Sequence, residues 1–580
     1  MDHTSAPKQD STTVSGAVGP TDNWSIGTMK KAEVDGHQIM VARTADGFHA
    51  VDNACPHQGY GLTTGVLDGN LVTCQWHNWK FDVTTGTCVR GEEDVACHQV
   101  DVVGGEVHVT IEQPTPAQRR AKLWPSLRRG LEQDYIGQMA RDSTRLLHAG
   151  ATPAAILAEA VAATAPRTED GIGHELAMTA DCLALAEIRE GTDQALPVVQ
   201  GLAALAEETR DRPERPVGRP DSSIDIPAAV EAEDINAAMA GVLGAIVDGR
   251  EPVEVRHDLI EAATAHHLGY GHGMIYTQKS FEFLDRVGWD QAPNLLPHLA
   301  ARLVGHTRED TLPYMVGAMR QLSGIDLDAL ASAERADGWQ PDALIDTMLH
   351  AAEAPLAAAA DAAVNGAGID GVLDVVSLAA SRRLLRHDLD VELDRNDRFG
   401  WLDITHALTT AQAARWAWTV DRSPATARAA LFATWLVFDS GRSERRRGIA
   451  VPNETVADLL ASSNATSRPT VDSPDADALT AAIRRGDDAG AVAAAVTAAP
   501  DAVGTTLAEA SLEDTSGSFI VAAHLIKTSE AARREAAVLD SPLPLAAAAR
   551  FLAAPKVERF VAINVAEAIG FVTTGRPPKR

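Results

Sequence analysis

Short apolar and alternating runs fill the region between Trp24 and Ile111. The runs "QIMVART", "GFHAVDNA", "NLVTCQWH" and "EVHVTIE" are separated by Gly, Asp and Asn in "EVDGHQ", "TADG", "LDGN" and "VGGE". Apolar residues that alternate with polar ones, bounded by turn residues, are typical of strands in antiparallel hairpins. The pattern predicts a small all-β domain over residues 23–113.

A different pattern begins after "EQPTPAQRR". Segments such as "ATPAAILAEAVAAT", "HELAMTADCLALAEIREG" and "DINAAMAGVLGAIVDG" carry apolar residues at helical spacing, with Gly or Pro at their ends. No fixed-period repeat is visible, so the pattern does not indicate a helical solenoid. It predicts an all-α domain over residues 120–580. The expected fold class is therefore multidomain, with a small all-β domain followed by a large all-α helical domain.

The composition argues against some classes of binding partner and favours one cellular compartment. The 580 residues carry a formal net charge of −29, which disfavours nucleic acid and anionic membranes because like charges repel. Residues 1–22 are rich in Ser, Thr, Gly and Pro and are expected to be a disordered tail. We find no secretory signal and no apolar run suited to a bilayer, and the five cysteines do not form a disulfide framework. We expect a cytoplasmic protein.

Two short segments of the β region carry metal-ligand chemistry. Cys55-x-His57 is followed sixteen residues later by Cys74-x-x-His77. Two Cys and two His can bind structural zinc, although zinc sites usually pair like ligands within one short segment. Here each segment supplies one thiolate and one imidazole. This distribution suits a [2Fe–2S] cluster, in which both thiolates bind one iron and both imidazoles bind the other.

The motif C-x-H…C-x-x-H, with Pro56 after the first cysteine and Gly59 in the same loop, resembles the Rieske family over about residues 22–113. The resemblance implies a [2Fe–2S] cofactor bound by Cys55 and Cys74 at the inner iron and by His57 and His77 at the outer one.

Departures from the high-potential members of that family bear on the redox potential. Those members carry an extra disulfide-forming cysteine in each loop, whereas this chain has Gln75 in the second loop and "QGYG" in the first. Their cluster sulfurs accept hydrogen bonds from Ser and Tyr hydroxyls, at places where this chain has Trp79 and Phe81. Fewer such bonds predict a potential toward the low end of the roughly −150 to +300 mV Rieske range. This is the ferredoxin or oxygenase type, which receives electrons from a reductase.

An electron carrier joined to a long helical region implies an electron acceptor there. Histidines stand among small apolar neighbours in "GIGHELAMTADCLALAEI", "GYGHGMIYTQKSFEFLDRVG", "GWLDITHALTTAQAARWAW" and "FIVAAHLIKTSEAARREA". In this order, the blocks resemble the questin oxidase-like family of helical oxygenases over about residues 125–560. The resemblance implies a mononuclear non-haem Fe(II) bound by His174, His272, His406 and His524, with Lys527 as a catalytic lysine carboxylated by CO2. A carbamate would supply the hard anionic oxygen that neutral imidazoles lack, and CO2 reacts only with the free amine, which burial favours.

Other metal sites stay open at the level of sequence. His266, His267, His298 and His306 compete for the same roles, and any single helix-borne histidine is more often a hydrogen-bonded core residue. The ring-hydroxylating Rieske oxygenases place Asp or Asn three residues before the first histidine. The pair His267-x4-His272 has Thr264 at that position instead. Glu254-x-x-His257 and Asp403-x-x-His406 supply only one orthodox E-x-x-H motif of the two that a ferritin-like di-iron site needs.

These features predict an iron-dependent oxygenase. A ferredoxin or NAD(P)H-dependent reductase would reduce the cluster, which would pass electrons to an iron that activates O2 against an organic substrate. The resemblance to the questin oxidase-like family implies an aromatic or polyketide-type substrate. No Rossmann fingerprint is present, so we expect no bound flavin or NAD. The alternative is an electron-transfer or redox-sensing protein whose helical domain is a metal-free binding or assembly module. A homo-oligomer is compatible with either.

Overall fold

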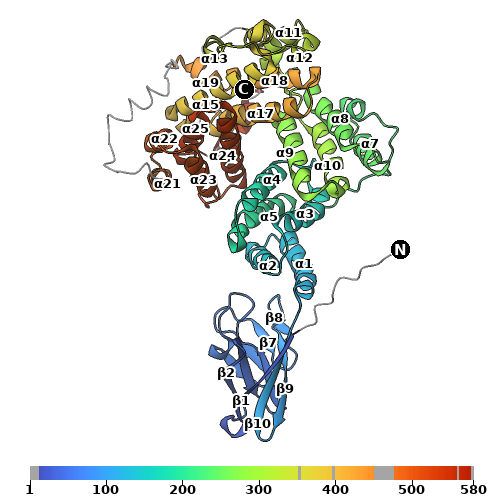
Figure 1. Ribbon diagram of the computed structural model, residues 1–580, viewed down its shortest axis with the longest axis vertical. Coiled ribbons are helices and arrows are strands. Elements are labelled where there is room, and N and C mark those ends of the chain that lie inside the picture. Colours follow the sequence, from blue (N-terminus) through green and yellow to red (C-terminus); the bar gives the residue numbers. More distant parts are fainter. Residues whose placement is uncertain are drawn as a thin grey trace. The chain divides into compact units, whose positions relative to one another are not determined.

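The structure is a computed structural model that describes residues 12–349, 354–394, 397, 399–449, 476–557 and 561–575. The chain divides into two compact units, Met1–Leu123 and Trp124–Arg580. The first unit is built of strands and the second of helices (Figure 1). The expected fold class, an all-β domain followed by a large all-α one, is confirmed.

The β unit contains two antiparallel sheets. The larger has the strand order β1-β10-β9-β4-β3-β2 and the smaller has the order β5-β6-β7-β8. The strands are β1 (Thr12–Pro20), β2 (Thr28–Val34), β3 (His37–Arg43), β4 (Phe48–Asp52), β5 (Val66–Asp68), β6 (Leu71–Thr73), β7 (Lys80–Asp82), β8 (Cys88–Arg90), β9 (Cys97–Val103) and β10 (Glu106–Gln113).

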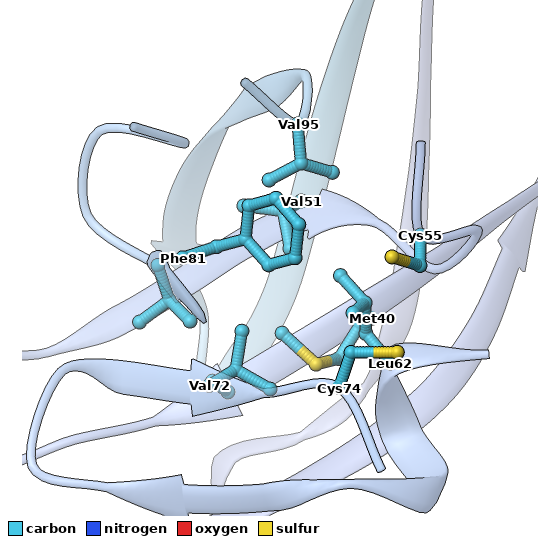
Figure 2. Close-up of a cluster of buried hydrophobic side chains, with 10 residues drawn as sticks. Met40, Val51, Cys55, Leu62, Val72, Cys74, Phe81 and Val95 are labelled. Atoms are coloured by element: carbon cyan, nitrogen blue, oxygen red, sulfur yellow. The ribbon is translucent and has the colours of Figure 1, made fainter. Parts of the chain in front are cut away.

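Strand β3 separates two hydrophobic cores, because successive side chains of a strand point to opposite faces. Ile39 and Val41 belong to a core that also contains residues of β10. Met40 and Ala42 belong to the other core, which includes Cys55 and Cys74. Figure 2 shows this second core, with the two cysteines among its aliphatic and aromatic side chains. The continuous apolar run "QIMVA" is thus explained by burial on both faces.

A disordered tail was expected over residues 1–22, and this expectation is wrong for residues 12–20, which form strand β1. Strand β1 pairs with β10 in an antiparallel register from Thr12 opposite Gln113 to Pro20 opposite Glu106. Its composition is poor in large apolar residues, so the strand is held by this edge pairing more than by burial. Residues 1–11 lie outside the described residues.

The helical unit contains the following α-helices: α1 (Pro116–Glu132), which begins in the first unit, α2 (Ile136–His148), α3 (Pro153–Thr164), α4 (His174–Glu187), α5 (Ala195–Thr209), α6 (Ile226–Glu231), α7 (Ile235–Val247), α8 (Pro252–Ala265), α9 (His272–Val287), α10 (Ala292–Gly305), α11 (Val316–Leu322), α12 (Leu327–Ala331), α13 (Asp342–Leu349), α14 (Pro355–Ala362), α15 (Gly368–Arg386), α16 (Leu389–Leu393), α17 (Trp401–Val420), α18 (Pro424–Asp439), α19 (Arg442–Arg447), α21 (Ala476–Arg485), α22 (Asp488–Thr497), α23 (Pro500–Ala510), α24 (Phe519–Leu539), α25 (Leu543–Ala553) and α26 (Val561–Thr574).

Four of these helices form a closed ring at the centre of the unit. Helix α4 packs against α9, α9 against α17, α17 against α24, and α24 against α4. Residues 175–186 of α4 and 273–284 of α9 are buried without interruption, so these helices are enclosed on every side. A helix buried all round needs no polar stripe. In α4, the alanines let neighbouring backbones approach closely.

One helical stretch, Pro355–Arg386, is long and apolar enough by composition to cross a membrane. However, 61% of its apolar window is buried inside the structure, and α15 packs against α17 and α25. Its apolar surface is therefore used in the core of the helical unit.

Candidate metal centres

The first candidate centre lies on two loops of the β unit, residues 55–60 and 74–79. In the first loop, the Cys55 backbone N–H donates to the Tyr60 carbonyl at 2.8 Å, and the Gly59 N–H donates back to the Cys55 carbonyl at 2.8 Å. Gly59 has φ 78°, a left-handed conformation that glycine adopts without strain.

The second loop repeats this backbone arrangement. The Cys74 N–H donates to the Trp79 carbonyl at 2.8 Å, and the Asn78 N–H donates to the Cys74 carbonyl at 3.2 Å. Asn78 has φ 60° and occupies the position of the first loop's glycine, as expected since Asn tolerates the left-handed region better than most residues. Two unrelated sequence segments therefore present a cysteine and a histidine from the same type of turn.

The four predicted ligands divide into an inner and an outer pair. The Cys55 and Cys74 side chains enter the hydrophobic core, with 2% of each residue exposed. His77 is exposed, His57 is half-buried, and their Nδ1 atoms face each other at 3.0 Å. Burial, with a smaller contribution from nearby Cys74, raises the pKa of the Cys55 thiol to about 12. A bound cation would remove this penalty by stabilising the thiolate.

Aromatic side chains from the opposite loop flank each histidine. The Trp79 ring stacks on His57 with centroids 4.8 Å apart. Tyr60 lies 6.2 Å from His77 and stacks on exposed Trp76 at 4.3 Å. Trp79 has no hydroxyl and packs against an imidazole.

The spacing of these donors favours a two-metal group over a single zinc ion. Within the described part of the chain, one set of three or more His, Cys, Asp or Glu donors lies within 4.8 Å, and it is in the helical unit. The cysteine–histidine set of the β unit is not among such sets, and its thiols are buried while its imidazoles lie further outward. Two inner thiols and two outer imidazoles fit a [2Fe–2S] cluster with one iron at each end.

The second candidate centre is formed by His174, His272, His406 and His524. One ring nitrogen of each lies within 4.8 Å of the others. The His272 Nε2 atom is 3.1 Å from His174 Nε2 and 2.8 Å from His406 Nε2. The His524 ring lies with its centroid 5.0 Å from that of His406 and 5.1 Å from that of His174. The structure thus brings together the four histidines selected from the sequence.

Outer contacts fix which nitrogen of His272 and of His524 faces inward. The Nδ1 atom of His272 lies 2.5 Å from the Gly269 carbonyl, and Nδ1 of His524 lies 2.7 Å from the Ile520 carbonyl. A carbonyl only accepts hydrogen bonds, so both Nδ1 atoms carry the proton and both Nε2 atoms present lone pairs. Lone pairs that converge in a buried space repel one another unless a cation lies between them. This arrangement fits a metal ion bound by imidazole nitrogens.

Tyr276 makes the corresponding outer contact to His174, since its hydroxyl lies 2.7 Å from His174 Nδ1. Tyr276 is one helical turn after His272 and is almost fully buried. The sequence analysis missed this residue, although its spacing from His272, four residues along one helix face, is a usable signal.

Burial suppresses protonation throughout the site. It lowers the pKa of His406 to about 3, with the Lys527 charge as a second cause, and it lowers those of His174, His272 and His524 well below the usual value. Neutral imidazoles are the form that binds metal.

Lys527 is buried beside these rings, with 2% of the residue exposed. Its Nζ atom has no hydrogen-bond partner among the described residues. Burial lowers the pKa of this amine to about 7. A substantial fraction is therefore uncharged near neutral pH, as reaction with CO2 requires.

The four ligand-bearing helices run parallel. Lys279 and Asp181, each seven residues beyond the histidine of its own helix, form a buried ion pair at 2.7 Å. Gln278 and Gln412, each six residues beyond, are 2.5 Å apart. Arg534 and Glu282 form an ion pair, and each lies ten residues after the histidine of its own helix. Helix α24 is therefore aligned with α9 in the same direction.

All four helices thus direct their N-terminal ends toward the histidines. Each N-terminus carries about half a positive charge, which favours a bound anion and disfavours protonated imidazole. His174 and His272 are themselves the first residues of α4 and α9.

A left-handed turn precedes His272. Gly269, Tyr270 and Gly271 have φ values of 53°, 57° and 93°. A Cβ atom at Gly269 would collide with the His306 imidazole, and one at Gly271 would collide with the Thr410 hydroxyl. Tyr270 is the non-glycine member, and its hydroxyl is anchored by donation to Asp439 at 2.9 Å. Backbone strain of this kind is concentrated at functional sites, and here it orients the first residue of α9.

The competing candidates lie outside the four-histidine set. His266 contacts Asp310 at 2.7 Å and Glu231 at 2.9 Å, and His257 contacts Asp421 at 2.9 Å on the surface. His267 and His298 are buried and His306 is half-buried, but none of them is a member of the set.

The motifs considered for other metal sites have structural roles. Thr264 donates to the Ile260 carbonyl, and Asp403 accepts from the Gly400 N–H at the start of α17. Neither the ring-hydroxylating triad nor the di-iron motif is assembled among the described residues.

The comparisons with known proteins concern the β unit. Residues 15–102 match the family model for the Rieske [2Fe-2S] domain. Over 105 residues the chain is 34% identical to the ferredoxin component of the alkene monooxygenase system of Xanthobacter autotrophicus, covering 17% of this chain and 82% of that protein. Over 113 residues it is 30% identical to apoptosis-inducing factor 3 of Homo sapiens, covering 19% of each, so the chain spans about a fifth of that relative's length.

Among solved structures, the ferredoxin of carbazole 1,9a-dioxygenase from Nocardioides aromaticivorans IC177 is 31% identical. The match covers 17% of this chain and 96% of that chain, with a TM-score of 0.16.

Proposed function

Because this chain belongs, through its β unit, to the Rieske [2Fe–2S] family, we propose that it is an iron-dependent oxygenase fed by its own electron-transfer domain. The β unit receives electrons from a separate ferredoxin or NAD(P)H-dependent reductase. The four-histidine site of the helical unit uses them to activate O2 against an organic substrate. The observation that carries the proposal is the gathering of four imidazoles within 4.8 Å, two of them buried and two half-buried.

In the β unit, the protein holds the cluster at the tips of two matched loops. Cys55 and Cys74 anchor it in the core, while His57 and His77 place its other end toward the surface. Outward imidazoles give a partner close access to the redox group, and inward thiolates keep water from the sulfurs. Relatedness to the ferredoxin component of a monooxygenase system supports this electron-delivery role.

In the helical unit, burial keeps the four imidazoles neutral, and outer contacts orient three of them, His174, His272 and His524. Iron bound there would supply the redox and O2-binding chemistry that side chains lack. The ligands are all neutral, and the helix N-termini add positive potential, so the site needs an anionic partner. We assign this role to Lys527 as its carbamate. The buried free amine beside the histidines supports that assignment.

The substrate we propose is an aromatic or polyketide-type molecule, and the compartment is the cytoplasm. Exclusion of water from the buried site would strengthen every electrostatic interaction with such a substrate. The reductase is expected to be a separate protein.

Iron analysis of the full chain tests the proposal. We expect about three iron atoms per chain in the wild type, two in the cluster and one in the helical unit. His272→Ala and His524→Ala should each lower the content to about two while leaving the Rieske EPR signal intact. His298→Ala is the matched control, because His298 is a buried histidine of the same unit, like His524, but lies outside the four-histidine set.

Two iron atoms per chain in the wild type, unchanged in both variants, would favour an electron-transfer protein with a metal-free helical module. Anomalous iron scattering from crystals would locate the third iron directly.

A further inference from the structure

Two of the five tyrosines of the chain place their rings against the four-histidine site. The Tyr276 ring lies beside His272, with centroids 5.2 Å apart, and its hydroxyl contacts His174. The Tyr270 ring meets His406 edge to face, with centroids 5.9 Å apart. A phenol can be oxidised by one electron, whereas an aliphatic side chain resists such oxidation. Both rings are therefore placed to exchange an electron with a metal bound by the histidines.

Tyr270 is joined to the site through its backbone as well. The carbonyl of the preceding residue, Gly269, lies 2.5 Å from Nδ1 of His272. Tyr270 itself has φ 57°, a left-handed conformation that it shares with the glycine on either side. A residue with a side chain adopts this conformation only under strain, and such strain is concentrated at functional sites. The turn thus holds the phenol against one ligand histidine and a carbonyl against another.

The hydroxyl contacts distinguish the two tyrosines. A tyrosine that loses an electron becomes a strong acid, so the oxidation needs a base at the hydroxyl. The Tyr270 hydroxyl donates to Oδ2 of Asp439 at 2.9 Å, and Asp439 is buried. The Tyr276 hydroxyl instead contacts Nδ1 of His174. With Nε2 of His174 on a metal, Nδ1 carries a proton and accepts no other. Of the two tyrosines, Tyr270 is the one whose hydroxyl faces a base.

Arg442 fixes the position of this base. Its guanidinium forms an ion pair with the same carboxylate oxygen and lies 5.8 Å from the centroid of the Tyr270 ring. The buried Phe399 ring packs on the phenol edge to face, with centroids 6.3 Å apart. The hydroxyl is thus directed at a fixed acceptor. The positive charge also makes the phenol harder to oxidise, so that only a strong oxidant takes its electron.

We propose that Tyr270 is a redox-active tyrosine, which gives one electron to the four-histidine iron site and its proton to Asp439 when O2 or peroxide has oxidised the iron and no substrate is bound. The inference rests on the proposed function, because the oxidant is formed at that iron. A tyrosine that the reductase can reduce again would protect the ligand histidines from irreversible oxidation.

The step balances in atoms and electrons. The O–H bond of Tyr270 breaks, an O–H bond forms at the Asp439 carboxylate, and one electron passes to the oxidised iron site. A neutral tyrosyl radical is left. One electron supplied through the β unit, together with the return of the proton from Asp439, restores the phenol.

Freeze-quench EPR of the full chain tests the proposal with a readout other than turnover. Iron-loaded protein is treated with ascorbate, which is too weak to reduce a low-potential cluster, freed of excess reductant, and mixed with hydrogen peroxide without organic substrate. We expect the hyperfine pattern of a tyrosyl radical, which narrows when the tyrosines are ring-deuterated. The radical should be lost in Tyr270→Phe, and also in His272→Ala, which would lack the helical iron.

Tyr314→Phe is the matched control and should keep the radical. The Tyr314 hydroxyl also donates to a carboxylate, that of Glu309 at 2.6 Å, and its ring also lies beside Arg442. Among the described residues, however, its ring makes no contact with the four histidines. Asp439→Asn keeps the phenol but removes the proton acceptor, so the radical should be lost there and restored in Asp439→Glu.

Spin trapping in the wild type gives a second measurement that needs no substitution. Peptide mass spectrometry should find the adduct of a nitroso trap on Tyr270, and an adduct confined to other residues would overturn the proposal. A wild type with about three iron atoms per chain but no tyrosyl signal, or a signal undiminished in Tyr270→Phe, would refute the role of Tyr270 and leave the proposed function standing. A signal undiminished in Asp439→Asn would refute the proton transfer. Absence of the helical iron from the wild type would overturn both proposals.

Discussion

The two candidate metal centres use histidine in opposite ways. In the β unit, two histidines project outward from loops whose cysteines are nineteen residues apart, and one of the histidines is exposed. In the helical unit, four buried or half-buried histidines come from helices separated by about a hundred residues or more. The first centre is local and its histidines lie toward the surface, whereas the second is assembled from distant segments and lies among packed helices. Under the proposed function, one residue type serves electron transfer near a surface and oxygen chemistry among packed helices.

The two centres also differ in the charge that their own ligands supply. The inner ligands of the β unit are thiols that carry negative charge when a metal binds, so that centre supplies its own anions. The helical centre offers only neutral imidazoles, surrounded by four helix N-termini and a buried lysine. An anionic ligand must therefore come from elsewhere, which is why the modified lysine is central to the proposed function.

Removal of one inner thiol should give the largest effect, and it tests whether the two centres are independent. We expect Cys74→Ser to abolish the visible absorption and the Rieske EPR signal, because a neutral hydroxyl replaces a thiolate bound to the inner iron. The helical iron should stay at about one per chain. Cys97→Ser is the control, since Cys97 is exposed on a strand of the same unit. Loss of the helical iron as well would show that the centres depend on one another.

Acid should weaken the metal-free helical unit through its buried histidines. The pKa of His406 is about 3 in the folded state and near 6.5 when unfolded, so unfolding takes up a proton between these values. The stability due to neutral His406 is present above pH 6.5 and is lost as the pH falls toward 3. Replacement by Gln should reduce the pH slope of the unfolding free energy by about 1.4 kcal/mol per pH unit in this window.

Circular dichroism during chemical unfolding at several pH values measures the pH slope of the unfolding free energy for the wild type and for His406→Gln. Burial raises the pKa of Glu175 to about 7 and that of Asp181 to about 6, which acts in the opposite direction. These contributions cancel when the His406→Gln slope is subtracted from the wild-type slope. Identical slopes would contradict a buried, neutral His406.

Loss of the outer contact of Tyr276 should have the smallest effect of the three predicted substitutions. Tyr276→Phe removes only the hydroxyl that lies 2.7 Å from His174 Nδ1. We expect metal affinity at the helical centre to fall about 10- to 100-fold, as for other outer contacts of ligating histidines, with the Rieske signal unchanged. Chelator competition measures this affinity. Tyr314→Phe is the control, because the Tyr314 hydroxyl donates instead to Glu309 at 2.6 Å; equal affinities in the two variants would remove Tyr276 from the site.

The β unit could be predicted almost completely because its information is local. Alternation along β10 and the turns between strands mark the sheet, and the ligands of each loop lie within three residues of each other. The exception is β1, whose Ser-, Thr- and Gly-rich sequence is typical of a tail. Its order comes from pairing with β10, about ninety residues away, which no local pattern records.

The helical unit shows the opposite balance. The four histidines could be selected from their sequence blocks, yet nothing in the sequence indicates that α4, α9, α17 and α24 run parallel or that His267 and His306 fall outside the set. Helices enclosed on every side lose the polar stripe from which orientation is usually inferred. Tyr276, the Gly269 carbonyl and the charged layer around Lys279 acquire roles only through long-range contacts.

The sequence by itself determined the order of the two units, the cysteine–histidine loops and the pool of helical histidines, since each depends on residues close together in the chain. Only the tertiary structure decided which imidazoles converge, which nitrogen each presents, and how deeply Lys527 is buried. Those properties depend on the packing of helices far apart in sequence, and packing fixes the distance, the dielectric surroundings and the hydrogen-bond partners of every group.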